Sequence, residues 1–215
     1  MPIADSMAIG PFTLDVVVTD PPWFENCYIL RHTASGAQAV FDPGSSPERI
    51  AAKLQAGGGA LDAIYLTHGH PDHLGAVAAL QARFGVACHA HRDERSLVEG
   101  AAALSMALAG IPVEPPTGCE WFENDASFSL GGEAFSVFPT PGHTPGGVCF
   151  VFPGFALTGD TLFQGGIGRS DLPGGDPRKL DDSITRLLAA LPRETLLFSG
   201  HGPYWTIREA RAWWG

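Results

Sequence analysis

The densest chemical motif is the run of residues 68–73, with the sequence HGHPDH, which directly follows a predicted apolar strand. It holds four side chains that are able to bind a metal ion. Residues two apart point to the same side of an extended chain, so His68 and His70 can share one ion. The start of the following helix turns Asp72 and His73 toward a second ion. Imidazole and carboxylate groups suit zinc, iron, nickel or manganese.

A solvated helix entry, with Asp72 near the cap, is the alternative interpretation of this run. Three further residues favour metal binding, because each follows a predicted strand in a glycine-containing loop: His143, Asp160 and His201. A neighbouring glycine lets the backbone approach a site closely. Strand ends that meet at one edge of a sheet form a shared pocket, and we expect these side chains to converge there.

Strands and helices follow one another in an order that predicts two sheets with helices packed outside them. The predicted strands cover residues 12–19, 26–31, 38–42, 61–67, 86–90, 127–130, 133–140, 148–152, 155–158 and 195–199. The predicted helices cover residues 46–56, 74–84, 92–109, 177–191 and 207–214. A glycine-rich loop is expected over residues 159–175.

Composition narrows the class of protein. The chain has 215 residues, of which 45% are hydrophobic, and its formal net charge of −10 would repel a nucleic acid. Its four cysteines are far apart with no CxxC pair, which favours free thiols in a reducing compartment. Residues 1–10 show no signal peptide, and the longest weakly polar stretch, residues 101–113, is too short to span a bilayer. We therefore expect a cytoplasmic protein with neither a nucleic-acid nor a membrane partner; the sequence leaves its oligomeric state open.

The order of these metal-binding residues resembles the metallo-β-lactamase superfamily. The resemblance covers about residues 26–203 and rests on a motif in several parts. It implies an α/β (α+β) fold, a four-layer αββα sandwich with the metals at one edge of the sheets. It also implies the following ligands: His68, His70 and His143 for one metal, Asp72, His73 and His201 for the other, and Asp160 as the bridge between them.

Seven ligands are typical of a dinuclear hydrolase in this superfamily. Two divalent ions supply an activated water molecule at neutral pH. The resemblance makes Asp72 the predicted catalytic residue, which orients this water and relays its proton. We expect zinc, with iron or a mixed zinc and iron pair as alternatives, because His/Asp sites accept all of them.

The loop of residues 159–176 is similar to that of compact bacterial type II glyoxalases. These enzymes hydrolyse S-D-lactoylglutathione to D-lactate and glutathione in methylglyoxal detoxification. Longer members carry a C-terminal helical domain that helps to bind glutathione, and the chain ends soon after His201. We therefore expect a single domain over residues 1–215 without that helical domain, and a preference for another thioester or ester remains an alternative.

Arg169, Ser170 and Lys179 are the predicted substrate-binding residues. The two cations can meet the carboxylates of a glutathione thioester, the small-molecule partner that we expect. Alternatively, Arg169 pairs within its own loop, with Asp171 or Asp176.

Trp23 and Phe24, in the loop before the second predicted strand, are further candidates for the substrate wall.

Two other classes of function compete with a hydrolase. A persulfide dioxygenase of this superfamily binds a single iron through the equivalents of His68, His143 and Asp160, and has a related Gly-Arg-x-Asp loop. Metal count and oxygen consumption distinguish it. A non-catalytic metal-binding or scaffold protein is the third class, and the full ligand set disfavours it. An exported β-lactamase is disfavoured because such enzymes usually lack the bridging aspartate, which is present here as Asp160.

Overall fold

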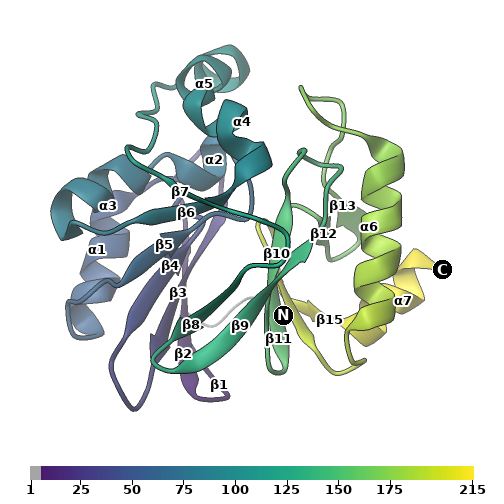
Figure 1. The fold of residues 1–215 in the computed structure, drawn as a ribbon, viewed down its shortest axis with the longest axis horizontal. Coiled ribbons are helices and arrows are strands. Elements are labelled where there is room, and N and C mark those ends of the chain that lie inside the picture. The colour runs from purple at the N-terminus through teal and green to yellow at the C-terminus, as the bar shows by residue number, and fades with distance from the viewer. Residues whose placement is uncertain (1–5) are drawn as a thin grey trace.

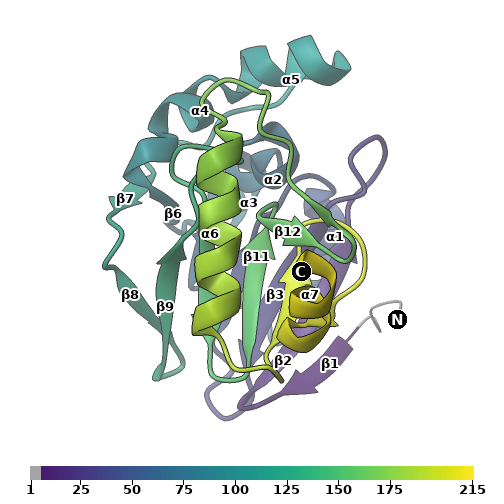
Figure 2. The same cartoon turned by 90° about the vertical axis from the view of Figure 1, so that its right-hand side faces the viewer.

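Two sheets face each other and helices cover both outer faces (Figure 1). Helices α1 (Pro47–Ala56) and α3 (Val77–Phe84) pack on the first sheet. Helices α6 (Pro177–Ala190) and α7 (Ile207–Trp214) pack on the second, as the turned view in Figure 2 shows. This arrangement confirms the four-layer αββα sandwich.

The computed structural model describes residues 6–215. The first half of the segment 1–10, in which no signal peptide is expected, therefore lies outside the described residues. In the part that is described, no helix is both long and apolar enough to cross a membrane.

Within residues 6–215 the first sheet has seven strands, whose spatial order follows the chain from β1 to β7. The strands are β1 Ser6–Ile9, β2 Phe12–Val18, β3 Asn26–His32, β4 Gln38–Phe41, β5 Ala63–Tyr65, β6 Cys88–His91 and β7 Glu120–Phe122. From β4 onward neighbouring strands are parallel, and helical crossovers join them. The remaining crossover elements are α2 Pro71–Leu74, the 3-10 turn η1 Arg92–Glu94, α4 Arg95–Glu99 and α5 Ala101–Ala109. Parallel strands place their carboxyl ends at one edge of the sheet, which is where the histidine-rich run begins.

The second sheet has six strands in the order β15-β14-β11-β10-β9-β8. They are β8 Ser127–Leu130, β9 Glu133–Pro139, β10 Val148–Phe152, β11 Phe155–Gly159, β14 Leu196–Ser199 and β15 Trp205–Thr206. Strands β11 and β14 are parallel, and the crossover between them contains α6. A small hairpin of β12 (Leu162–Phe163) and β13 (Gly166–Ile167) follows β11.

Among the described residues, three hydrophobic clusters hold the four layers together. Aromatic side chains fill the space between the sheets, where Phe152 stacks on Phe155 with ring centroids 4.5 Å apart and Phe41 meets Phe150 edge to face. Largely aliphatic clusters lie between each sheet and its helices. Fully burying side chains of this size contributes roughly 1.5–3 kcal/mol each. The packed layers thus give the strand ends fixed positions.

Several elements differ from those predicted. The predicted helix 92–109 is divided into η1, α4 and α5, and Gly100, a poor helix former, separates the two α-helices. The predicted helix 74–84 begins only at Val77, as α3, because Leu74 ends α2 and a turn follows at Gly75, where a Cβ atom would lie 2.4 Å from the carbonyl oxygen of Gly44. The predicted loop 159–175 contains the β12-β13 hairpin. The sequence predicts none of the strands β1, β7 and β15, whose two to four residues show no sustained alternation of apolar and polar side chains.

Candidate metal centre

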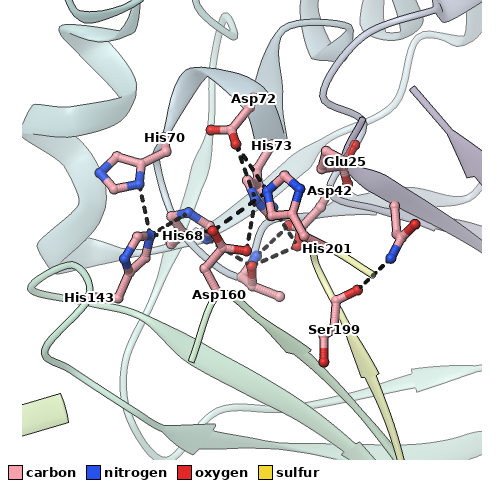
Figure 3. Close-up of polar contacts among 12 residues, drawn as sticks. Glu25, Asp42, His68, His70, Asp72, His73, His143, Asp160, Ser199 and His201 are labelled. Atoms are coloured by element: carbon pink, nitrogen blue, oxygen red, sulfur yellow. Dashed lines mark hydrogen bonds and ion pairs between the residues drawn. The ribbon is translucent and has the colours of Figure 1, made fainter. Parts of the chain in front are cut away.

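Seven side chains from both sheets converge at one edge of the sandwich (Figure 3). They are His68 and His70 after β5, Asp72 and His73 in α2, His143 between β9 and β10, Asp160 after β11, and His201 after β14. The structure therefore brings together all the metal-binding residues predicted from the sequence. Their individual roles as ligands stay predictions.

Three histidines form the first set. Nε2 of His143 lies 3.2 Å from Nε2 of His68 and 2.9 Å from Nδ1 of His70. All three side chains are buried. Burial, together with the neighbouring imidazoles, lowers the pKa of His68 and lowers that of His70 to about 4. Burial also lowers the pKa of His143. Near neutral pH these imidazoles are therefore uncharged, as a metal ligand must be.

The second set mixes two histidines with two carboxylates: Asp72, His73, Asp160 and His201. Nε2 of His73 lies 3.3 Å from Oδ1 of Asp160, and Nε2 of His201 lies 3.3 Å from Oδ2 of Asp72. Burial alone would lower the pKa of His73, but Asp160 and Asp72 outweigh it and raise this pKa well above its usual value. Burial alone would raise the pKa of Asp160, but His73 outweighs it and holds this pKa well below its usual range. The second set is thus a network of charges.

Asp160 lies between the two sets. Its Oδ2 is 3.7 Å from Nε2 of His201 in the second set and 3.8 Å from Nε2 of His143 in the first. A carboxylate has two oxygens and can contact two ions at once. Its position agrees with the bridging role that the sequence resemblance implies.

The residues present fit a divalent metal. Nε2 of His70 is buried and makes no hydrogen bond with any described residue, while Nε2 of His73 and Oδ1 of Asp160 face each other in a buried ion pair at 3.3 Å. A buried polar atom without a partner is costly, and a cation beside Nε2 of His70 would satisfy it. Imidazole nitrogen and carboxylate oxygen are common ligands of zinc and iron.

Asp42, at the end of β4, supports both sets and was not identified from the sequence. Its carboxylate accepts hydrogen bonds from the main-chain N–H and the hydroxyl of Thr67, at 2.7 and 2.6 Å. It also lies 3.1 Å from Nδ1 of His73, which directs Nε2 of that ring toward the metal centre. The Thr67 hydroxyl lies 3.1 Å from Nδ1 of His68. A strand-end aspartate followed by proline and glycine was the available signal, but such a triplet is also typical of an ordinary turn.

Glycines leave the space that the sequence predicted beside the ligands. A Cβ atom on Gly200 would lie 2.3 Å from Oδ1 of Asp160, and one on Gly159 would lie 2.2 Å from Oγ1 of Thr67. Gly159 also has a φ of +47°, which favours glycine. These positions confirm that the backbone crowds against the centre.

A cavity of about 300 Å³ opens onto the centre. Besides five of the seven side chains, its wall contains Trp23, Leu108, Phe163, Arg169 and Leu172. The wall is therefore largely apolar, whereas the bottom of the cavity is formed by the histidines and aspartates of the metal centre. Trp23 lies where the sequence suggested, whereas Phe24 is 57% exposed and is not among the described wall residues.

The predicted substrate-binding residues lie in different places. Arg169 is in the cavity wall, but its guanidinium donates two hydrogen bonds of 2.8 Å to Asp171. The internal pair that the sequence offered as an alternative for Arg169 is therefore present. Among the described residues, neither Ser170 nor Lys179 lines this cavity. The main-chain N–H of Lys179 instead donates to Asp176, which caps α6.

Comparison with known proteins identifies the class to which this fold and site belong. The sequence model described as the Metallo-beta-lactamase superfamily matches residues 20–201. The chain belongs to this superfamily. Together with the His/Asp centre, this membership points to the metal-dependent hydrolases and to a site for divalent metal.

Individual relatives narrow the comparison further. The chain is 34% identical to "Hydroxyacylglutathione hydrolase GloC" of Haemophilus influenzae over 191 residues, which cover 87% of this chain and 90% of the relative. The crystal structure of "BLEG-1 B3 metallo-beta-lactamase" is 35% identical with a TM-score of 0.85, and the match covers 93% of this chain and 96% of that one. The structure of "TTHA1623 in a di-iron-bound form" is 38% identical with a TM-score of 0.82, over 90% and 96% of the two chains.

Proposed function

We propose that this protein is a dinuclear metal-dependent hydrolase of thioesters, which converts S-D-lactoylglutathione to D-lactate and glutathione. The observation that carries the proposal is the pair of ligand sets joined through Asp160. A mononuclear centre made of His68, His143 and Asp160 would use only one of the four members of the second set. The name of the Haemophilus influenzae relative supports the choice of substrate.

Zinc is the metal that we propose, with iron or a mixed pair as alternatives because of the di-iron-bound relative. When bound, two divalent ions supply an activated water and a Lewis acid for the thioester carbonyl. The three-histidine set offers neutral ligands and the second set adds the carboxylates of Asp72 and Asp160.

Asp72 is the proposed proton acceptor. Its side chain lines the cavity, and its Oδ2 is 3.3 Å from Nε2 of His201. Burial alone would raise the pKa of Asp72, but His73 and His201 outweigh it and lower this pKa, so the carboxylate is ionised at neutral pH. During hydrolysis the water oxygen bonds to the acyl carbon, one water proton moves to Asp72, and the carbon–sulfur bond breaks. The proton then passes to the departing thiolate, which leaves as a thiol.

The cavity wall suits the thiol half of such a substrate. Trp23, Leu108 and Leu172 present apolar surface that can cover the sulfur and its methylene group. Arg169 can meet a glutathione carboxylate in exchange for Asp171, with the same bidentate geometry. The apolar wall equally suits other thioesters or esters, and these form the alternative substrate class.

A reducing compartment fits this substrate, because glutathione is kept as a thiol there. Cys27, Cys88, Cys119 and Cys149 are free in the structure. We accordingly propose a cytoplasmic location.

The test combines metal analysis with a substrate panel on one anaerobic preparation. Metal content is measured by mass spectrometry, and hydrolysis is measured with S-D-lactoylglutathione, an aliphatic acyl thioester, a phenyl ester and a cephalosporin. We expect two metals per chain and fastest turnover of the glutathione thioester. In Asp72→Asn, turnover should fall by about 10²–10⁴-fold, while Asp181→Asn, an exposed aspartate on α6, should match the wild type.

Other results would replace the proposal. One iron per chain, with oxygen uptake on glutathione persulfide and no hydrolysis, would assign a dioxygenase. Two metals with faster cleavage of the cephalosporin or the ester would keep the hydrolase and change its substrate. Normal turnover in Asp72→Asn would remove Asp72 from the mechanism.

A further inference from the structure

Glu94 is an acidic side chain with no exposed surface, and its carboxylate joins two separate loops. It ends the 3-10 turn η1, just before α4 at the top of Figure 1. Its Oε2 accepts a hydrogen bond from the main-chain N–H of Gly69, and its Oε1 accepts one from that of Gly146, both at 2.6 Å. Burial raises the pKa of Glu94, and these two N–H groups oppose the rise. A buried carboxylate is costly to keep unless such donors satisfy it.

The two loops that Glu94 joins carry all three histidines of the first set. Gly69 lies between His68 and His70, in the loop after β5 of the first sheet. Gly146 lies in the loop between β9 and β10 of the second sheet, three residues after His143. The two hydrogen bonds span 25 and 52 residues of sequence. One side chain therefore fixes the distance between ligands that belong to different sheets.

Both contacts depend on a glycine at the loop position. A Cβ atom on Gly69 would lie 3.1 Å from Oε2 of Glu94 and 2.9 Å from Cβ of Leu97. A Cβ atom on Gly146 would lie 3.1 Å from the main-chain nitrogen of Glu94 and 2.6 Å from Nδ1 of His91. The backbone of each loop thus approaches η1 and α4 more closely than a side chain would allow.

We infer that Glu94 is a positioning residue, which holds the His68/His70 loop and the His143 loop at the spacing that the first metal ion requires. The second set has its own support, since Asp42 holds His73. Loss of the Glu94 carboxylate should therefore weaken the binding of the first metal ion and leave the binding of the second unchanged. The inference rests on the proposed function only through the metal role of these histidines, and it is independent of the substrate.

The experiment titrates metal-free protein with Co²⁺ in competition with a chromophoric chelator, while the visible cobalt spectrum is recorded. Glu94→Gln keeps the shape of the side chain but turns an NH₂ group toward one of the two N–H donors. We expect one of the two Co²⁺ ions to bind about 10- to 100-fold more weakly and the other to bind as in the wild type. The matched control is Asp62→Asn, whose carboxylate accepts a main-chain N–H from Gln38 at 2.8 Å away from the centre.

A second measurement needs no variant and applies even if Glu94→Gln does not fold. In the metal-free wild type, hydrogen exchange followed by NMR should show slow exchange of the Gly69 and Gly146 amides, because both donate to Glu94 before any metal arrives. Fast exchange of either amide would overturn the inference.

The titration can overturn it too. Wild-type affinity for both ions in a folded Glu94→Gln protein, or equal loss of both ions, would remove the positioning role. If the wild type hydrolyses no thioester but Glu94→Gln still loses one ion selectively, the proposed function fails and this inference stands.

Discussion

His68 and His73 lie side by side, with ring centroids 4.1 Å apart, and both are almost fully buried. Their pKa values nevertheless move in opposite directions, downward for His68 and upward for His73. Desolvation lowers the pKa of both, so the difference comes from their neighbours. His68 is surrounded by imidazoles, whereas Asp160 and Asp72 face His73. At this one sheet edge the choice of neighbour, not the depth of burial, decides which set is neutral and which is charged.

Removal of Asp160 should have the largest effect, because its carboxylate lies close to imidazoles of both sets. Asp160→Ala takes away the carboxylate that faces His73, His201 and His143. We expect turnover to fall by orders of magnitude and the metal content to drop below two per chain, while the circular dichroism spectrum stays that of a folded protein. Asp125→Asn, an exposed aspartate, serves as the control. Near-normal turnover in Asp160→Ala would show that the two sets are independent.

A smaller effect than that of Asp160→Ala is expected in the pH dependence of the free energy of unfolding, which should differ between the two sets. His70 has a pKa of about 4 in the folded, metal-free protein, against an ordinary value of 6.5. Between these values the unfolded chain binds more protons than the folded one. The contribution of His70 to the free energy of unfolding is therefore fully present above pH 6.5, and roughly 3 kcal/mol is lost as the pH falls to 4. The measurement is urea unfolding of the metal-free wild type and of His70→Asn between pH 4 and 6.5. The free energy of unfolding should fall more steeply with falling pH in the wild type than in His70→Asn.

The contribution of His73 to the free energy of unfolding should change with pH in the opposite direction. Because its pKa is raised, its contribution to stability is present below pH 6.5 and is lost as the pH rises through the folded value. Comparing His73→Asn with wild type should therefore give a difference that shrinks with rising pH. If the difference in the free energy of unfolding changed with pH in the same direction for His70→Asn and for His73→Asn, the two sets would share one electrostatic environment.

The smallest effect is expected at the ion pair between Arg169 and Asp171, which lies outside both sets. Both side chains are mostly exposed, so the pair adds little to stability. Asp171→Asn should leave the melting temperature unchanged and lower KM for an anionic thioester by at most about fivefold, because it frees the guanidinium. The change should vanish at high salt and with an uncharged thioester. A higher KM would instead mean that Asp171 is needed to hold Arg169 in place.

The sequence was most informative about the seven clustered side chains. Five of them lie in short loops or turns at strand ends, Asp72 and His73 lie in the short helix α2, and four of the seven fall within the six residues 68–73. Strand ends and glycines can be recognised locally, so the convergence could be predicted without coordinates. The layered fold followed from the order of elements and from the family resemblance.

The supporting residues could not be found in the same way. Asp42 and Glu94 are single acids with no repeated spacing, and their partners lie 25 to 52 residues away. Leu108 and Leu172 reach the cavity from α5 and from the loop after β13, and only tertiary packing places them there. Arg169 was noticed for its charge, but its pairing with Asp171 depended on the conformation of the loop.

The metal centre draws its side chains from two halves of the chain. The four side chains after β5 of the first sheet are His68, His70, Asp72 and His73. The three after strands of the second sheet are His143, Asp160 and His201. Ions bound between them would cross-link the sheets and stabilise the folded state, by about 2.7 kcal/mol when free metal exceeds its dissociation constant 100-fold. Metal supply would then set the lifetime of the protein as well as its activity. When metal is scarce, a larger fraction of the protein would be unfolded and open to proteolysis.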